Sequence, residues 1–131
     1  IGEYWIKRYF ESKGHKVKLA DKKTGPVDLT VPDKGYMISV KTVTGWSKHG
    51  KGTQVKPLDR EKNKWDTLAA VKLKKDLHPE MIAIISLNEL LEKPQFMSNE
   101  QKRMNKEANS YPVFQWWDWL EPYKLKDIDQ L

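Results

Sequence analysis

Two short segments of alternating apolar residues, 27–31 and 36–41, are joined by a Pro-Asp-Lys-Gly turn. Such runs around a tight turn that contains glycine predict a β-hairpin. The side chains of a strand point alternately to the two faces of its sheet. We therefore expect the hairpin to bring Asp28, near the start of the first strand, close to Ser39 and Lys41, which share one face of the second strand.

Helical and extended patterns surround this hairpin. Residues 2–13 space their aromatic and apolar side chains along one helical face, and Gly14 is a typical residue just after a helix. Residues 15–20 alternate like a half-buried strand, and residues 67–73 and 80–87 predict two more strands. A helix is the competing prediction for the first of these two, since Ala and Leu tolerate both conformations. The order of elements predicts an α/β domain, in which helices pack on one mixed sheet.

The second half of the chain adds helical segments and an aromatic end. Residues 57–65 predict a short helix, and residues 88–92 a short helix or turn. A capping box predicts a further helix at residues 98–108. The tail, residues 113–120, contains three tryptophans and predicts an additional C-terminal strand or helix. Its aromatic side chains are expected to pack in the core or against a partner chain, and base stacking is the second interpretation.

Composition limits the classes of protein that the chain can represent. Its 131 residues suit one domain over residues 1–131, and the net charge of +6 favours nucleic acid or acidic surfaces as partners. The absence of cysteine excludes disulfides, thiolate metal sites and a cysteine nucleophile. No apolar run reaches the roughly 20 residues of a membrane span. The chain begins at Ile1 without Met, which is compatible with the C-terminal fragment of a longer protein.

The charged residues of the hairpin suit metal-assisted hydrolysis of a phosphodiester. This reaction uses a metal ion to polarise the phosphoryl oxygen and activate water, and a cation to stabilise the developing negative charge. Mg²⁺, or Mn²⁺ in its place, binds a few carboxylates and keeps sites for water and phosphate. Asp28 is then the expected metal ligand, and Lys41 would orient the water or stabilise the phosphorane. Val40 points into the core, and its backbone carbonyl is a further oxygen ligand.

The order of Glu3 on a first helix, Asp28 on a strand, and Ser39 two positions before Lys41 on the next strand resembles the PD-(D/E)XK nuclease superfamily. Restriction endonucleases belong to this superfamily. The resemblance covers about the first half of the chain and implies a restriction-endonuclease-like αβββαβ core. It places the family's helix glutamate on Glu3, its metal aspartate on Asp28 and its lysine on Lys41.

One position departs from the family's pattern. The second acidic residue, two positions before the lysine, falls on Ser39, which cannot supply a negative charge. Some restriction enzymes of the superfamily also carry Ser-x-Lys, with the glutamate displaced to a downstream helix. On this resemblance Glu61 is the candidate for the displaced carboxylate and metal ligand, and Asp59 is the second candidate. Without such a carboxylate, we expect a weak enzyme or a protein that binds nucleic acid without cutting it.

A strongly basic segment follows the lysine strand and is expected to contact phosphates. By its resemblance, the chain favours double-stranded DNA as the substrate, with tRNA as an alternative. Double-strand cutters pair two active sites, so a homodimer is a possible assembly. The residues expected to bind nucleic acid are Lys48, His49, Lys51, Lys56, Arg60 and Lys62.

The same site residues also have purely structural interpretations. Glu3 would favour the positive end of its helix, and Asp28 would be a solvated turn carboxylate. Lys41 would protect an edge strand from aggregation, and Ser39 would be an ordinary strand hydroxyl.

Other functions stay open on the sequence alone. A small bacterial toxin nuclease, acting on tRNA or DNA, would need a tight and acidic immunity protein. A catalytically inactive nucleic-acid-binding module would explain the serine at position 39, and a protein-interaction domain would use the Trp-rich tail. We expect a cytoplasmic protein, or one delivered into the cytoplasm of a target cell if it is a toxin.

Overall fold

A computed structural model of the chain describes residues 1–20, 27–44, 52–54, 64–92, 113–115 and 120–131. The helices within these residues are α1 (Gly2–Ser12), α2 (Leu87–Glu92) and the short 3₁₀ helices η3 (Glu121–Tyr123) and η4 (Ile128–Gln130). The strands are β1 (Lys18–Leu19), β2 (Leu29–Val31), β3 (Tyr36–Thr44), β4 (Gly52–Gln54), β5 (Thr67–Leu73), β6 (Pro79–Ser86) and β7 (Val113–Gln115).

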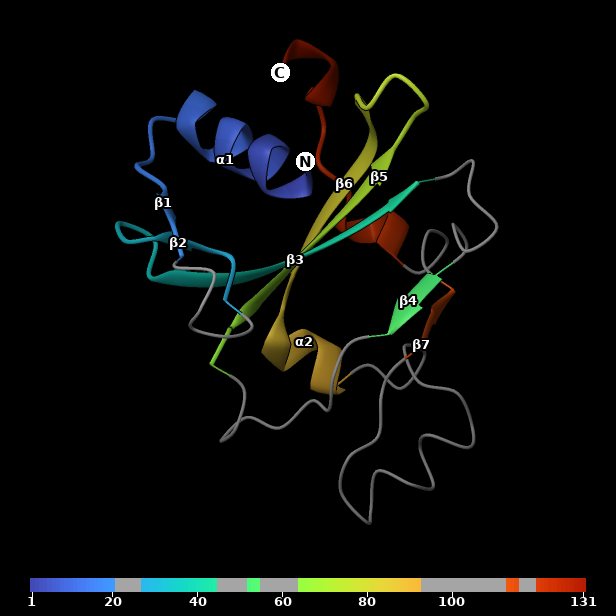
Figure 1. The fold of residues 1–131 in the computed structure, drawn as a ribbon. Coiled ribbons are helices and arrows are strands. Elements are labelled where there is room, and N and C mark those ends of the chain that lie inside the picture. Colours follow the sequence, from blue (N-terminus) through green and yellow to red (C-terminus); the bar gives the residue numbers. More distant parts are fainter. Residues whose placement is uncertain (21–26, 45–51, 55–63, 93–112, 116–119) are drawn as a thin grey trace.

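The main sheet has five strands in the order β1-β2-β3-β5-β6 (Figure 1). The central pair β3-β5 is parallel, and the other neighbouring pairs are antiparallel. The short strands β4 and β7 form a separate antiparallel pair, which links the segment after β3 to the C-terminal aromatic tail. The predicted α/β class, with one mixed sheet and packed helices, is therefore confirmed.

The predicted hairpin and the two later strands are present. Strands β2 and β3 pair antiparallel around the turn, where Gly35 has φ +69°. Residues 67–73 form strand β5, so the competing prediction of a helix there is wrong. Of the strand predicted at residues 15–20, only the two residues of β1 are extended and paired. A helix is predicted at residues 57–65, but residues 64 and 65 are not helical. Residues 57–63 lie outside the residues that the structure describes. The helix predicted at 98–108 also lies outside it.

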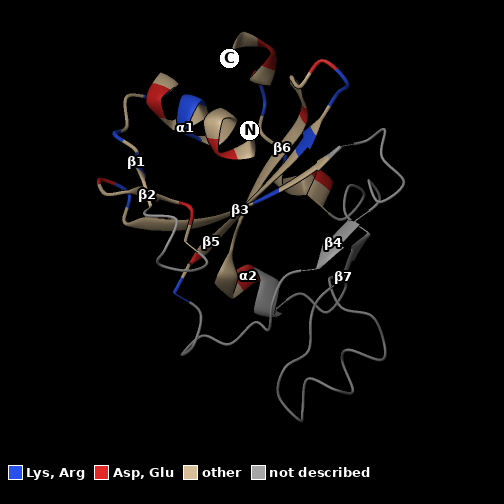
Figure 2. Cartoon of the chain, in the orientation of Figure 1, with Lys and Arg blue, Asp and Glu red and all other residues tan. Residues whose placement is uncertain are grey.

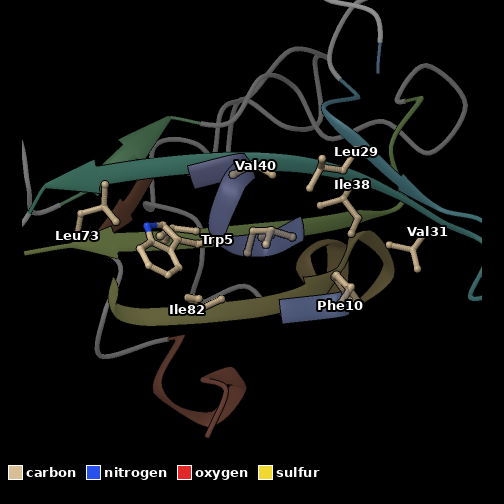
Figure 3. Close-up of a cluster of buried hydrophobic side chains, with 11 residues drawn as sticks. Trp5, Phe10, Leu29, Val31, Ile38, Val40, Leu73 and Ile82 are labelled. Atoms are coloured by element: carbon tan, nitrogen blue, oxygen red, sulfur yellow. The ribbon is translucent and has the colours of Figure 1, made fainter. Parts of the chain in front are cut away.

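Helix α1 packs its apolar face onto the sheet. Trp5, Ile6 and Phe10 recur at helical spacing and are buried against hydrophobic side chains of β2, β3, β5 and β6 (Figure 3). The helix ends as predicted, because Gly14 has φ +87°, a conformation that glycine adopts without strain. The indole N–H of Trp5 donates a 2.9 Å hydrogen bond to the carbonyl of Leu77, in the turn between β5 and β6. These contacts fix the position of α1 on its face of the sheet.

The strand register determines which face each residue of β3 presents. Val40 belongs to the hydrophobic core beneath α1, as predicted. Ser39 and Lys41 lie beside Leu68 and Ala70 of β5, which belong to a second hydrophobic cluster. Since neighbours in register point to the same face, Ser39 and Lys41 share the face opposite α1.

Asp66 joins the starts of β5 and α2 to β3. Its Oδ1 atom accepts hydrogen bonds from the backbone N–H of Met37, at 3.0 Å, and from the hydroxyl of Thr67, at 2.8 Å. Its own N–H donates to the Met37 carbonyl at 2.9 Å, and its carbonyl accepts from the N–H of Leu87 at 2.8 Å. This one residue therefore fixes where the parallel pair β3-β5 begins.

Charged residues lie mostly outside the core. Figure 2 shows acidic and basic positions along α1 and at the turn between β5 and β6, whereas the central strands carry few charges. Over the described ranges, the chain has no helix whose length and apolar character would let it traverse a membrane.

Candidate active site

The strands β2 and β3 separate at Asp28, and the carboxylate of Asp28 lies in the opening between them. Pairing of β2 with β3 covers only Leu29–Val31. The backbone N–H of Asp28 still donates to the Ile38 carbonyl at 2.8 Å, and its side-chain Oδ2 accepts a 2.7 Å hydrogen bond from the N–H of Val40. Backbone N–H groups of a strand point toward the neighbouring strand. The carboxylate therefore lies near the plane of the sheet, where groups from both faces can approach it.

The surroundings raise the pKa of the Asp28 carboxyl above its ordinary value. Burial is the largest cause, and the hydrogen bond from the Val40 N–H opposes it by stabilising the ionised form. The negative charge of Glu3 raises the pKa further, and the positive charge of Lys41 lowers it. Both charges therefore lie close enough to act on Asp28. The structure brings together three of the residues that the sequence analysis selected.

Lys41 and Ser39 approach this opening from the face opposite α1. Lys41 is half-buried on β3, and Ser39 is only 3% exposed. The position that carries an acid in the resembled family is thus a buried hydroxyl.

The charge of Glu3 acts on Asp28 because the N-terminus of α1 lies directly against β3. A Cβ atom on Gly2 would lie 1.9 Å from Oγ1 of Thr42 and 3.1 Å from a methyl group of Val40. Only glycine permits this close approach. Glu3, one residue further along, is in the first turn of α1, and its Oε2 lies 3.5 Å from the terminal ammonium of Ile1.

The oxygen atoms at this opening suit a hard divalent cation. Asp28 and Glu3 supply two carboxylates. The carbonyl of Val40 points to the same side as its N–H, and hence toward Asp28, because both groups of a strand residue face the same neighbour. In the described segments, no three acidic or histidine side chains group to hold a metal ion, so the third protein ligand would be this carbonyl. Two carboxylates, one carbonyl and remaining water sites match the ligands of Mg²⁺.

The other predicted site residues fall in segments outside the described residues. These include both candidates for the displaced carboxylate, Glu61 and Asp59. The same applies to the residues predicted to bind nucleic acid, Lys48, His49, Lys51, Lys56, Arg60 and Lys62. Their roles stay predictions.

Two features of the site have little or no signal in the sequence. The contact of Gly2 with Thr42 positions α1, and the only sequence signal for it is a glycine at the start of an otherwise well-formed helix. The hydrogen bond from the Val40 N–H to Asp28 has no sequence signal, because it depends on where two strands separate. His15, which received no role, is hydrogen-bonded through Nδ1 to Asp33 Oδ2 at 2.6 Å.

Comparisons with known proteins add little to this geometry. No protein-family model matches the chain, and no curated protein sequence matches it. Among solved structures, the fold is similar to a bacterial homing endonuclease with a TM-score of 0.49 and 14% sequence identity. That similarity covers 70% of this chain and 68% of the other. Any function of this chain must therefore be inferred from the site and not from this likeness.

Proposed function

We propose that this protein is a metal-dependent endonuclease of the PD-(D/E)XK type, which hydrolyses phosphodiester bonds of nucleic acid, with DNA as the preferred substrate. The observation that carries the proposal is the half-buried Asp28 carboxylate, held by the Val40 N–H where β2 stops pairing with β3, with the charges of Glu3 and Lys41 near enough to shift its pKa. Two acids, a lysine and a backbone carbonyl are the groups that metal-assisted phosphodiester hydrolysis requires. The net charge of +6 supports a polyanionic substrate.

Each residue has a distinct part in the proposed reaction. Asp28 and Glu3 would hold Mg²⁺, with the Val40 carbonyl as a third ligand. When bound, Mg²⁺ supplies a polarised phosphoryl oxygen and a more acidic water. The Val40 N–H keeps the Asp28 carboxylate in one orientation. The ammonium of Lys41 stabilises the negative charge that develops on the phosphate, or orients the attacking water.

Cleavage of supercoiled plasmid DNA and of total tRNA tests this proposal. Each substrate is incubated with Mg²⁺, with Mn²⁺ and with a chelator. We expect cleavage only with metal, and a loss of at least about 100-fold in Asp28→Asn and in Lys41→Met. Asp129→Asn is the matched control, since it neutralises an exposed carboxylate on η4 and should retain full activity. Equal activity in Asp28→Asn and in Asp129→Asn would contradict the proposal.

Ser39 favours a second candidate function, a module that binds nucleic acid without cutting it. Its buried hydroxyl replaces a charged ligand, and the described residues supply only two carboxylates to the site. Under this alternative the wild-type protein cuts neither substrate with any metal, but its affinity for DNA falls steeply as salt increases. Affinity without salt dependence would instead support a domain that binds other proteins.

A further inference from the structure

A pocket lies beside the other half of α1, away from Asp28. Near the C-terminal end of α1, side chains of the helix, the β2-β3 turn and the C-terminal segment line an open pocket of about 370 Å³. This volume is at the lower end of the range for small-molecule sites. Phe10 is seven positions after Glu3 on α1, which corresponds to about 10 Å along the helix axis. The pocket is therefore distinct from the candidate active site. The residues that line it are Tyr9, Phe10, Lys13, His15, Lys34, Tyr36, Ile84 and Leu125.

The inner wall of the pocket is aromatic. Phe10 is buried, and the rings of Tyr9 and Tyr36 lie edge-to-face against it with centroid distances of 5.2 Å and 6.1 Å. The ring of His15 lies 6.3 Å from Phe10 in a similar orientation. Both tyrosines and the histidine are only partly buried, so they can contact a ligand. A planar aromatic group gains the most from such a wall, because ring pairs stack or meet edge-to-face.

The rim of the pocket is positively charged. Lys13 and Lys34 are both exposed, and the described residues give neither of them an ion-pair partner. The Lys13 ammonium lies 5.8 Å from the centre of the Tyr9 ring. Asp33 is the acidic neighbour, and the hydrogen bond from His15 lowers the pKa of its carboxyl. Because Asp33 engages Nδ1 of His15, the other ring nitrogen is left for a ligand, and the two lysines outweigh the single carboxylate.

From the aromatic wall and the two lysines, we propose that this pocket binds one nucleotide, with the base against Tyr9 and Tyr36 and the phosphate between Lys13 and Lys34. Aromatic side chains beside a cationic rim are the groups that hold unpaired nucleotides in proteins. The same chemistry has two sources, a free mononucleotide and an unpaired nucleotide of a longer strand. The site does not depend on the proposed nuclease activity.

Titration of the folded protein with adenosine 5′-monophosphate, followed by ¹H–¹⁵N NMR in chelator, tests this proposal. We expect shifts at Tyr9, Tyr36 and His15, and an affinity at least about tenfold higher than for adenosine or for inorganic phosphate alone. Phosphate that binds as tightly as the nucleotide would overturn the proposal, because the aromatic wall would then contribute nothing. Absence of shifts at these residues would also overturn it.

Two double variants separate the pocket from general charge. Lys13→Ala with Lys34→Ala should weaken nucleotide binding about tenfold or more. Lys16→Ala with Lys18→Ala removes the same charge from exposed positions outside the pocket and should leave binding unchanged. Equal weakening in both would overturn the proposal.

A single-stranded tetranucleotide identifies the source of the ligand. If the tetranucleotide shifts the NMR signals of the same pocket residues more strongly than the mononucleotide does, the pocket binds an unpaired nucleotide of a strand. If only the mononucleotide binds in the pocket, its ligand is a free mononucleotide. Both results support a nucleotide site, and cleavage activity enters neither measurement. Failure of the pocket is therefore distinguishable from failure of the nuclease proposal.

Discussion

Replacement of Gly2 by alanine should displace α1 from β3 and disturb the candidate active site. The new Cβ would lie 1.9 Å from Oγ1 of Thr42, whereas ordinary contact begins at 3.4 Å, so the Thr42 side chain must rotate or the two elements must move apart. Rotation of the Thr42 side chain cannot remove the whole conflict. The Cβ of Thr42 at 3.2 Å and the Val40 methyl at 3.1 Å would still be too close for a relaxed contact.

The expected loss of stability follows from two opposing contributions. Overpacking of this kind costs about 1–3 kcal/mol, and alanine gains at most about 1 kcal/mol over glycine in a helix. We therefore expect Gly2→Ala to lower the free energy of unfolding by about 1–2 kcal/mol. Glu3 moves with the helix, and a displacement of about 1 Å in a catalytic group can reduce activity about 100-fold. Urea unfolding and plasmid cleavage measure the two effects.

A second substitution tests whether this contact is the cause. Thr42 is exposed, so Thr42→Ala alone should change stability by no more than about 0.5 kcal/mol. In the double variant, removal of Oγ1 makes room for the new methyl group, and most of the lost stability and activity should return. If Gly2→Ala is as stable and active as the wild type, or if Thr42→Ala does not rescue it, the reasoning about the α1-β3 contact is wrong.

Three further substitutions test other parts of the structure. In thermal unfolding with chelator at pH 7, Asp28→Asn should be more stable than the wild type, because the folded state raises the pKa of Asp28 and so disfavours its charge. The gain should vanish below about pH 3.8, and a loss of stability at pH 7 would contradict it. In urea unfolding, Asp66→Ala should lower the free energy of unfolding by about 1–2 kcal/mol, since Asp66 Oδ1 accepts two hydrogen bonds. Asp66→Asn keeps an oxygen that can accept them and should retain most of the stability. The hydrogen bond with His15 lowers the pKa of Asp33, so this pair contributes stability above about pH 3.8 that is lost as the pH falls further. Asp33→Asn lacks this contribution. Below that pH, its melting temperature should therefore fall less steeply than the melting temperature of the wild type.

The fold class was predictable because its signals are local and strong. Alternation in residues 27–31 and 36–41 and the apolar runs at 67–73 and 80–87 predict strands, and the helical spacing of Trp5, Ile6 and Phe10 predicts α1. The strand at residues 15–20 was overestimated, since β2 extends its pairing only to Lys18 and Leu19. Pairing between distant segments, such as β4 with β7, depends on long-range contacts that no local pattern encodes.

Strand alternation made part of the candidate site predictable, namely which side chains share a face of the sheet. The period of two placed Ser39 and Lys41 on one face, and the turn brought Asp28 beside them. The position of the Asp28 carboxylate near the plane of the sheet was not predictable, because it depends on β2 leaving β3 one residue earlier than a continuous hairpin would.

Titration with Mn²⁺, followed by paramagnetic broadening in ¹H–¹⁵N spectra, tests most directly whether Asp28 and Glu3 share a divalent cation. We expect the amide signals of Glu3, Asp28 and Val40 to broaden first at low Mn²⁺, and Asp28→Asn to abolish this selectivity. Broadening that begins around Asp76 and His78, and is the same in Asp28→Asn, would contradict the account.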